Sequence, residues 1–565
     1  MSTTLLPTHN GPDERLSIDS QELHELYETK LQSEQSFPAR VSHGVSSLFQ
    51  RFPSLRYPRR HDYTALDSTS TSTSIPTRRY YRHLRRIPYY LSVFISILIA
   101  LAAITFTFFP SYTYPPEHYI SLRNRVLNTD PNSKLSGRGN VHNEKIFIAA
   151  SLYDPTGELA RGHWSSSVLE LITLLGEENV FLSIYENDSG EEGEASLADL
   201  DARIPCNKSI VYEHLDLDSL PTITTPDGAE RVKRITYLAE TRNRALEPLD
   251  DPEIMSGTRF DKLLYLNDIA FDPLDALQLL FSTNVNAKGK AQYRAACAVD
   301  FINPFKFYDT YATRDLEGYS MGVPFFPWFS DSGDARSRED VLAGKDAVPV
   351  KSCWGGMVAF DAKFFQHQGN TTDIETSEVR GKGMDTAGQS PPARFRALND
   401  TDLFWDASEC CLIHADIQPP PTHPETSSPS SSSSSSPETK FTPAPIPETG
   451  IYMNPFVRVA YDPYTLSWLA TTRRFEKLYS LIHNIVNHLV GMPWFNARRE
   501  ELPGETYYDT VFVPAKEEGG VGSFESRERV GRHDGFCGRS GLQVVVPREG
   551  GKGWWTVPRP VGVVQ

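Results

Sequence analysis

The chain has 565 residues and a formal net charge of −16. This excess of acidic residues argues against nucleic acid as a partner, because the phosphate backbone repels it. The length allows more than one domain, but serine- and proline-rich stretches indicate that part of the chain does not build a core.

Two amino-terminal segments differ sharply in composition. Residues 1–86 have no hydrophobic periodicity and are rich in serine, threonine, proline and arginine, so we expect a disordered tail. Residues 87–109 carry no charge and are long enough to cross a bilayer core of about 30 Å as a helix. A helix buried in a soluble protein is the alternative. Arginines crowd the amino side, which favours a cytosolic tail and a luminal body.

The part of the chain from residue 144 to residue 495 predicts a folded domain. Residues 110–143, rich in proline, glycine and polar side chains, are expected to form a luminal stem before it. Short apolar runs alternate with helical patterns, which is typical of βαβ units and a parallel sheet. The expected strands lie at 145–153, 180–185, 210–212 and 263–266, and the expected helices at 168–175, 231–246 and 272–281.

The strand at 263–266 ends in Asn267 and Asp268. Ligands of open α/β sheets bind at the carboxyl ends of strands, so these side chains stand where chemistry is usually done. A carboxylate there suits Mg²⁺ or Mn²⁺, hard cations that prefer oxygen ligands and bridge to a diphosphate. An Asn-Asp pair that only shapes a turn is the alternative.

Further polar groups follow in the second half of the domain. A strand at 293–300 ends in Asp300, a polar and aromatic loop follows, and Gly355-Gly356 leads into a strand that reaches residue 361. The glycines suit either a ligand or a tight turn. We expect another short strand at 408–417, with His414 as a metal ligand, a base or a structural residue. Order resumes at residues 450–461, and an amphipathic helix at 475–489 completes the domain.

Two regions near the carboxyl terminus have a biased composition, and the cysteines and glycosylation sequons indicate the compartment. Residues 419–449, with a serine run, predict a disordered insertion, and residues 496–565 a glycine-rich, irregular extension. All six cysteines follow the apolar segment, which is consistent with disulfides in an oxidising lumen or with buried thiols. Sequons for N-glycosylation begin at Asn187, Asn207, Asn370 and Asn399.

Several motifs occur in one order: Leu-Ala-Glu-Thr-Arg-Asn-Arg-Ala-Leu-Glu-Pro-Leu at 238–249, Leu-Tyr-Leu-Asn-Asp at 264–268, Cys-Trp-Gly-Gly-Met at 353–357, Ser-Glu-Cys at 408–410 and Asn-Pro-Phe-Val-Arg-Val-Ala-Tyr at 454–461. With them the chain resembles the fungal capsule-associated α-1,3-mannosyltransferases, the cryptococcal mannosyltransferase type of glycosyltransferase family 69. The resemblance implies a GT-A-like nucleotide-sugar-binding mixed sheet flanked by helices, preceded by one transmembrane helix. It also implies type II Golgi topology and transfer of mannose from GDP-mannose to a glycan acceptor with retention.

Together, the resemblance and the residue pattern give a set of expected site residues. Many GT-A enzymes carry Asp-X-Asp where this chain has Asn267-Asp268. The expected catalytic residues are Asp268, Asp300, Asp309 and Glu409. Donor and acceptor are expected to contact Tyr185, Glu186, Arg242, Asn243, Asn267, Arg314, Asp315, Trp354, Gly355 and Gly356. A divalent cation, Mn²⁺ or Mg²⁺, is expected on Asp268, Asn267 and His414.

Two rival functions stay open at this point. A related transferase would use another nucleotide sugar, and a luminal glycan-binding scaffold would keep the fold without turnover. Arg242 in particular suits either the leaving diphosphate or an internal ion pair.

The arginine cluster before the apolar segment makes the topology testable. Protease added to sealed microsomes should remove only the amino-terminal tail, and an endoglycosidase should shift the band of the protected body, because sequons in the lumen acquire N-glycans. A protected tail with a digestible body would contradict the orientation.

Overall fold

The structure is a computed structural model, and the residues that it describes are 77–127, 137–255, 258–367, 391–398, 402–419, 448–513, 522–548 and 551–559. The expected disordered tail lies outside them up to residue 76, as does the expected insertion from 420 to 447. The chain divides into two compact units, Met1–Leu101 and Ala102–Gln565. The second unit contains the folded body.

The apolar segment lies in helix α3, Thr77–Phe108. Its part Pro88–Phe108 is long and apolar enough to cross a membrane, and almost none of it is buried. No other helix among the described residues meets both criteria. Because its aliphatic side chains are exposed, α3 differs from the buried helix of a soluble core.

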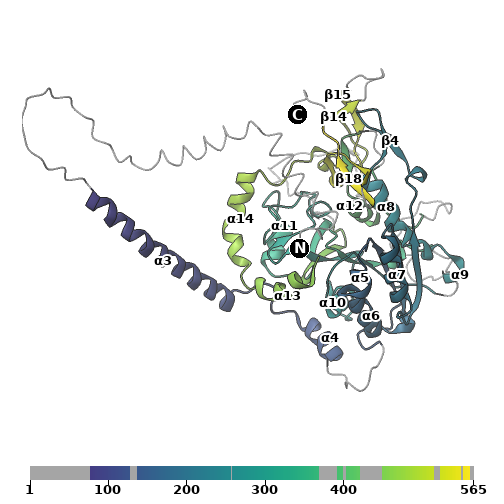
Figure 1. Cartoon of the computed structure of the whole chain (residues 1–565), viewed down its shortest axis with the longest axis horizontal. Coiled ribbons are helices and arrows are strands. Elements are labelled where there is room, and N and C mark those ends of the chain that lie inside the picture. Colours follow the sequence, from purple (N-terminus) through teal and green to yellow (C-terminus); the bar gives the residue numbers. More distant parts are fainter. Residues whose placement is uncertain are drawn as a thin grey trace, which may run out of the picture. The chain divides into compact units, whose positions relative to one another are not determined.

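A ten-stranded mixed sheet forms the centre of the body (Figure 1). Its strand order is β3-β2-β1-β6-β11-β7-β13-β10-β9, and β8 pairs with β7. The strands β3, β2, β1 and β6 are parallel, whereas β11 is antiparallel to both β6 and β7. The bounds are β1 Ile146–Leu152, β2 Val180–Asn187, β3 Asn207–Glu213, β6 Lys262–Leu266, β7 Ala295–Asn303, β8 Lys306–Phe307, β9 Arg314–Asp315, β10 Val348–Ser352, β11 Met357–Asp361 and β13 Ile451–Ala460.

Alternating side chains of the strands build two cores, one on each face of the sheet. In β1, Phe147 and Ala149 join one core while Ile146 and Ile148 join the other, as the period of two in a strand requires. Helices α8 (Arg234–Arg244) and α12 (Glu409–Ile417) pack on the first face, and α6 (His163–Leu175), α7 (Gly190–Asp201) and α10 (Pro273–Ser282) on the second. The expected fold class, a mixed α/β sheet flanked by helices, is confirmed.

The remaining helices of the body also pack against these two cores. They are α4 Glu117–Leu127, α5 Glu158–Arg161, α9 Pro252–Met255, α11 Arg336–Leu342, α13 Pro463–Thr472 and α14 Lys477–Val490. The expected helix at 475–489 is thereby confirmed as α14, which ends at Gly491 in the left-handed region.

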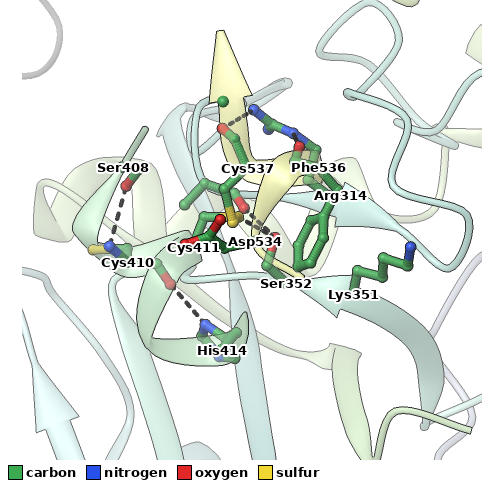
Figure 2. The surroundings of a disulfide bond; sticks show 12 residues. Arg314, Lys351, Ser352, Ser408, Cys410, Cys411, His414, Asp534, Phe536 and Cys537 are labelled. Atoms are coloured by element: carbon green, nitrogen blue, oxygen red, sulfur yellow. Dashed lines mark hydrogen bonds between the residues drawn. A yellow bond between two sulfur atoms is a disulfide. The ribbon is translucent and has the colours of Figure 1, made fainter. Parts of the chain in front are cut away.

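The strand expected at 408–417 is wrong, because these residues form helix α12. The hydroxyl of Ser408 accepts a hydrogen bond from the backbone N–H of Cys410 and so caps the first turn (Figure 2). Every residue of the helix except Asp416 is buried. A helix buried all round has no apolar stripe, so its sequence carries no helical period.

The stem expected over residues 110–143 also differs, since much of it packs onto the body. Tyr119, Leu122 and Val126 recur at helical spacing on α4, and all three are buried. Nearer the apolar segment, the Tyr112 hydroxyl donates to the carbonyl of Val341 at 2.9 Å. The body therefore begins almost directly after α3.

The carboxyl-terminal extension is more regular than expected. It contains the hairpins β14–β15 (Thr506–Val513, Ser523–Val530) and β17–β18 (Gln543–Arg548, Gly551–Thr556), while β16 (Gly538–Ser540) pairs with β12 (Trp405–Ala407). A third hairpin, β4–β5 (Thr222–Thr224, Glu230–Val232), precedes α8.

Two disulfides decide the open question of the cysteines. Cys297 pairs with Cys353 inside the sheet, and Cys411 of α12 pairs with Cys537 in the extension. Cys206 and Cys410 are buried free thiols. The second disulfide closes a separation of 126 residues and fastens the extension to the helix that carries Glu409.

Removing the Cys411–Cys537 disulfide should lower the free energy of unfolding by about 2–4 kcal/mol, because the cross-link restricts the unfolded chain across a long loop. The double substitution Cys411→Ser, Cys537→Ser would show this in urea unfolding. The control is Cys206→Ala, which removes an unlinked thiol. Equal unfolding of the wild type with and without reductant would contradict the assignment.

Candidate active site

The carboxyl end of β6 is held by backbone contacts on both sides. All five residues of β6 are buried, and Asn267 and Asp268, which follow, are half-buried. The N–H of Asn267 donates to the Gly356 carbonyl at 2.9 Å, and its carbonyl accepts from the Trp164 indole at 2.9 Å. The two polar side chains are thus presented from a fixed backbone at the edge of the sheet.

Asn267 orients two neighbours through one oxygen. Its Oδ1 accepts a hydrogen bond from Arg242 Nη1 at 3.1 Å and from the Trp354 indole at 3.2 Å. A carbonyl oxygen has two lone pairs, and both face donors here. The structure therefore makes Asn267 a positioning residue and not the metal ligand that the sequence led us to expect.

Arg242 is the centre of this arrangement. Its Nε donates to Glu409 at 2.9 Å, and both side chains are almost fully buried. Its guanidinium lies 4.5 Å from the ring centroid of Trp354 and 5.4 Å from that of Tyr265. Burial disfavours the cation, but the pKa of Arg242 is raised well above its usual range, with the hydrogen-bonded carboxylate of Glu409 among the causes, so Arg242 stays charged.

The same contacts change the role of Trp354 and Asn243. Trp354 is only 3% exposed and its ring is covered by Arg242, so it stabilises the cation and does not offer an open face to a sugar. Both side-chain atoms of Asn243 bond the backbone of Phe395 at 2.8 Å. Asn243 therefore holds Phe395 beside Trp354.

The Gly355-Gly356 turn connects β6 to the acidic groups of the next strands. Both glycines have positive φ, +60° and +65°, and a Cβ on Gly355 would lie 2.0 Å from the carbonyl of Ala298. Glycine is required here by the protein's own backbone. The turn directs the N–H of Gly355 to Asp309 Oδ2 at 3.3 Å.

Asp300, which lies in β7, is fully buried. Its two oxygens accept hydrogen bonds from the Asp309 N–H at 3.1 Å and from the Tyr461 hydroxyl at 3.0 Å. Burial, together with the nearby charge of Asp309, raises the pKa of Asp300 well above its usual range. Asp300 thus fixes the loop that carries Asp309, which is itself half-buried.

Arg314 and Asp315 are buried and bonded to backbone groups, which differs from their expected role in substrate binding. The Arg314 guanidinium donates to the carbonyls of Phe536 at 3.0 Å and Cys537 at 3.1 Å, and so holds the extension (Figure 2). Asp315 Oδ1 accepts from the N–H groups of Glu317 and Tyr319 and closes a turn. Burial raises the pKa of Asp315 to about 7.

His414 is fully buried and has protein partners on both ring nitrogens. Nδ1 lies 2.7 Å from the Cys410 carbonyl (Figure 2). Nε2 lies 3.8 Å from the sulfur of Cys297. Among the described residues, one compact group of three potential metal-ligating side chains occurs: Cys297, Cys353 and His414. The two cysteines form a disulfide with each other, so neither has a thiolate to bind a metal. His414 is therefore a core residue, contrary to the expected metal ligand.

Tyr185 and Glu186 lie at the end of β2, next to the end of β1, where Leu152 is paired with Glu186. Both are buried, and burial raises the pKa of Glu186 to about 7. No described residue gives either carboxyl oxygen of Glu186 a hydrogen bond. Tyr185 and Glu186 lie at the same carboxyl edge of the sheet as Asp268, but they are two strands away, because β1 stands between β2 and β6.

The sequence reading missed Tyr461, Phe395 and Trp164. Tyr461 is the last residue of the motif at 454–461 that carries the family resemblance, and this was an available signal. Phe395 lies in an irregular segment, and Trp164 precedes the recognisable part of its helix. Neither position had a pattern that marked it.

Comparison with known proteins supports the family resemblance. Residues 145–416 match the family model described as cryptococcal mannosyltransferase 1. No curated protein matches the chain. Among solved structures, the mannosyltransferase PcManGT from Pyrobaculum calidifontis, in complex with GDP-Man and Mn2+, is similar at 9% identity with a TM-score of 0.23. This similarity covers 44% of the present chain and about half, 52%, of that chain.

The matched residues contain Arg242, Asn267, Asp268, Asp309 and Glu409, whereas Tyr461, which bonds Asp300, lies outside them. Residues 145–416 are thus similar to the cryptococcal mannosyltransferase family.

Proposed function

We propose that the protein transfers mannose from GDP-mannose to a glycan acceptor, with α-1,3 linkage and retention, as a single-pass Golgi enzyme whose body lies in the lumen. The observation that carries the proposal is the convergence of Arg242, Asn267, Asp268 and the Gly355-Gly356 turn at the end of β6. A glycosyltransferase needs a fixed cationic group there, because the departing nucleoside diphosphate gains negative charge.

Arg242 is suited to this task because it needs no rearrangement at the moment of reaction. Glu409 and Asn267 hold its guanidinium in one orientation, and the surrounding rings exclude water. A charged donor in such a low-dielectric site stabilises developing charge more strongly than it would in water. The burial of Glu409 beside Arg242 makes Glu409 a positioning residue.

A divalent cation, Mn²⁺ or Mg²⁺, would be held by Asp268. The oxygen donors of this edge fit such an ion, since hard cations are commonly bound by one or two carboxylates together with substrate phosphates. When bound, the cation would supply further positive charge to the diphosphate. The side-chain oxygen of Asn267 accepts hydrogen bonds from Arg242 and Trp354. The carboxylate of Asp268 would therefore be the protein's ligand for the cation.

The nucleoside is assigned to the end of β2. Tyr185 and Glu186 stand at the carboxyl end of β2, and a carboxyl group is chemically suited to the N–H and O–H donors that a nucleoside supplies. Asp309 is placed by Asp300 and Gly355 on the opposite side of β6 and would face the acceptor hydroxyl. Transfer from GDP-mannose by the purified chain would separate this function from a scaffold, and a screen of other nucleotide sugars would separate it from a related transferase.

Asp268→Asn should reduce transfer by about 10²-fold or more, because it removes a charged ligand at the diphosphate while keeping the shape of the side chain. The fold should survive, since β6 packs through its buried apolar residues. Donor turnover, measured as a function of Mn²⁺ concentration, checks the loss of transfer and the change in metal response.

The control is Asp275→Asn in α10. Asp275 lies in the helix that follows Asp268, and burial raises its pKa to about 7, so at neutral pH the amide replaces a group that is protonated about half of the time. Wild-type turnover and metal response in Asp268→Asn would show that Asn267-Asp268 only shapes a turn.

Glu409→Gln should destabilise the fold by about 3–5 kcal/mol, because it leaves the buried charge of Arg242 without its counter-ion. Arg242→Lys should keep one positive charge but lose the fork that reaches both Glu409 and Asn267, and so lower turnover more than donor affinity. Urea unfolding and steady-state kinetics measure the two effects.

Arg244→Lys, two residues further along α8, is the matched control. Its ion pairs with Glu240 and Glu247 are partly exposed, so the change should cost about 0–1 kcal/mol and leave turnover unchanged. Equal effects of the two arginine substitutions would contradict the special role of Arg242.

A further inference from the structure

Helix α14 is fastened to the body by polar side chains and turns its apolar side chains outward. On its inner face, His483 and Asn487 are buried. The Asn487 amide bonds His483 Nδ1 at 2.9 Å, and Arg338 Nη1 also lies 2.9 Å from that nitrogen. The Nε2 of His483 lies 3.2 Å from the Val323 carbonyl. Internal hydrogen bonds therefore hold the helix in place.

The outer face of α14 is a continuous aliphatic surface. With 3.6 residues per turn, positions 481, 482, 485 and 489 fall on one side of a helix. These are Leu481, Ile482, Ile485 and Leu489, and their side chains are 66%, 59%, 61% and 73% exposed. On neighbouring α13, Tyr464 and Trp468 are exposed and their rings contact each other. We call these six residues the outer face; α13 and α14 lie on the surface of the body (Figure 1).

The end of the apolar segment is tied to the junction between these two helices. The ring centroid of Phe106 lies 5.2 Å from that of Phe475, and the Arg474 guanidinium lies 4.7 Å from the Phe106 ring. Only Phe109 and Pro110 separate the span Pro88–Phe108 from Ser111, whose N–H donates to the Arg473 carbonyl at 3.2 Å.

The junction is itself rigid. Arg473 donates to the carbonyl of Tyr112 at 2.9 Å, and Arg458 of β13 forms a two-bond ion pair with Glu476, at 2.8 and 2.7 Å. All four side chains are at least partly buried. If the span crosses the bilayer, these contacts hold the start of α14 where the span leaves the hydrocarbon.

We propose that the outer face of α13 and α14 lies in the surface of the lipid bilayer, so that the catalytic body is docked on the membrane and does not hang from a flexible stem. The inference rests on the membrane anchoring within the proposed function. An apolar helix face buried at the headgroup boundary gains from removal of its side chains from water. The aromatic pair on α13 suits the same interface, where amphipathic rings collect.

The bilayer is favoured over a second copy of the chain because of the tether. If the span crosses the bilayer and ends at this junction, the lipid surface is always close to the outer face. A second copy of the chain would have to reach the outer face by diffusion. Docking would also keep the orientation of the β6 edge relative to the membrane constant, so that acceptors near the membrane surface are preferred.

The test uses the full chain in phosphatidylcholine nanodiscs, with single cysteines that carry an environment-sensitive fluorophore. Ile485→Cys reports on α14, Ile97→Cys on the span, and Ser526→Cys on an exposed strand of the body. The native free thiols Cys206 and Cys410 are buried and serve as the unlabelled background. We expect blue-shifted emission at positions 485 and 97, and loss of most of that emission when nitroxide-labelled phosphatidylcholine is added, with no change at 526.

Each other outcome overturns the inference in an identifiable way. Quenching at 97 without quenching at 485 refutes docking and leaves the anchor intact, and no quenching at 97 refutes the anchor and docking together. Shielding at 485 that depends on protein concentration and resists the lipid quencher identifies a second copy as the occupant. None of these readouts depends on transfer activity, so failure of the proposed chemistry is distinguishable.

A second variant checks that the surface itself is responsible. Leu481→Glu with Ile482→Glu should lower the quenching of the label at 485 and leave the melting temperature in detergent unchanged, because both side chains are exposed. Unchanged quenching would contradict the docking.

Discussion

A buried ion pair organises the site. Arg242 comes from a helix on one face of the sheet and Glu409 from another helix, and they meet at 2.9 Å where almost no water reaches them. Neither charge is tolerable alone at this depth, so the pair requires α8 and α12 to pack in one register. Asn267 then links the pair to the end of β6. Because the buried charges must neutralise each other, the positions of the polar groups around Asp268 are fixed.

The rest of the body supports that placement from several directions. The Cys411–Cys537 disulfide and the Arg314 hydrogen bonds hold the extension against α12 and its neighbours. The Gly355-Gly356 turn, which only glycine can form beside Ala298, joins the β6 edge to Asp309. These contacts connect residues far apart in the chain, which explains why the carboxyl-terminal extension is part of the folded unit.

The fold was largely predictable because β1, β2, β6 and β7 are apolar runs of strand length separated by helical patterns. Asn267 and Asp268 were found for the same reason, since they terminate such a run. The roles of three residues were not predictable, because each depends on a partner from a distant segment of the chain. Arg314 bonds backbone carbonyls of the extension, His414 contacts a disulfide, and Trp354 contacts the cation of Arg242. Helix α12 was missed because it is buried nearly all round, and the outward apolar face of α14 because periodicity gives the contrast between faces but not their direction.

The most direct test of the central claim is calorimetric titration of the purified chain with GDP-mannose, with and without Mn²⁺, beside the same titration with a UDP-sugar. We expect that GDP-mannose binds, that Mn²⁺ strengthens the binding, and that the UDP-sugar binds more weakly under the same conditions. Equal binding of both donors, or no binding of either, would contradict the assignment of the β6 edge as a GDP-mannose site.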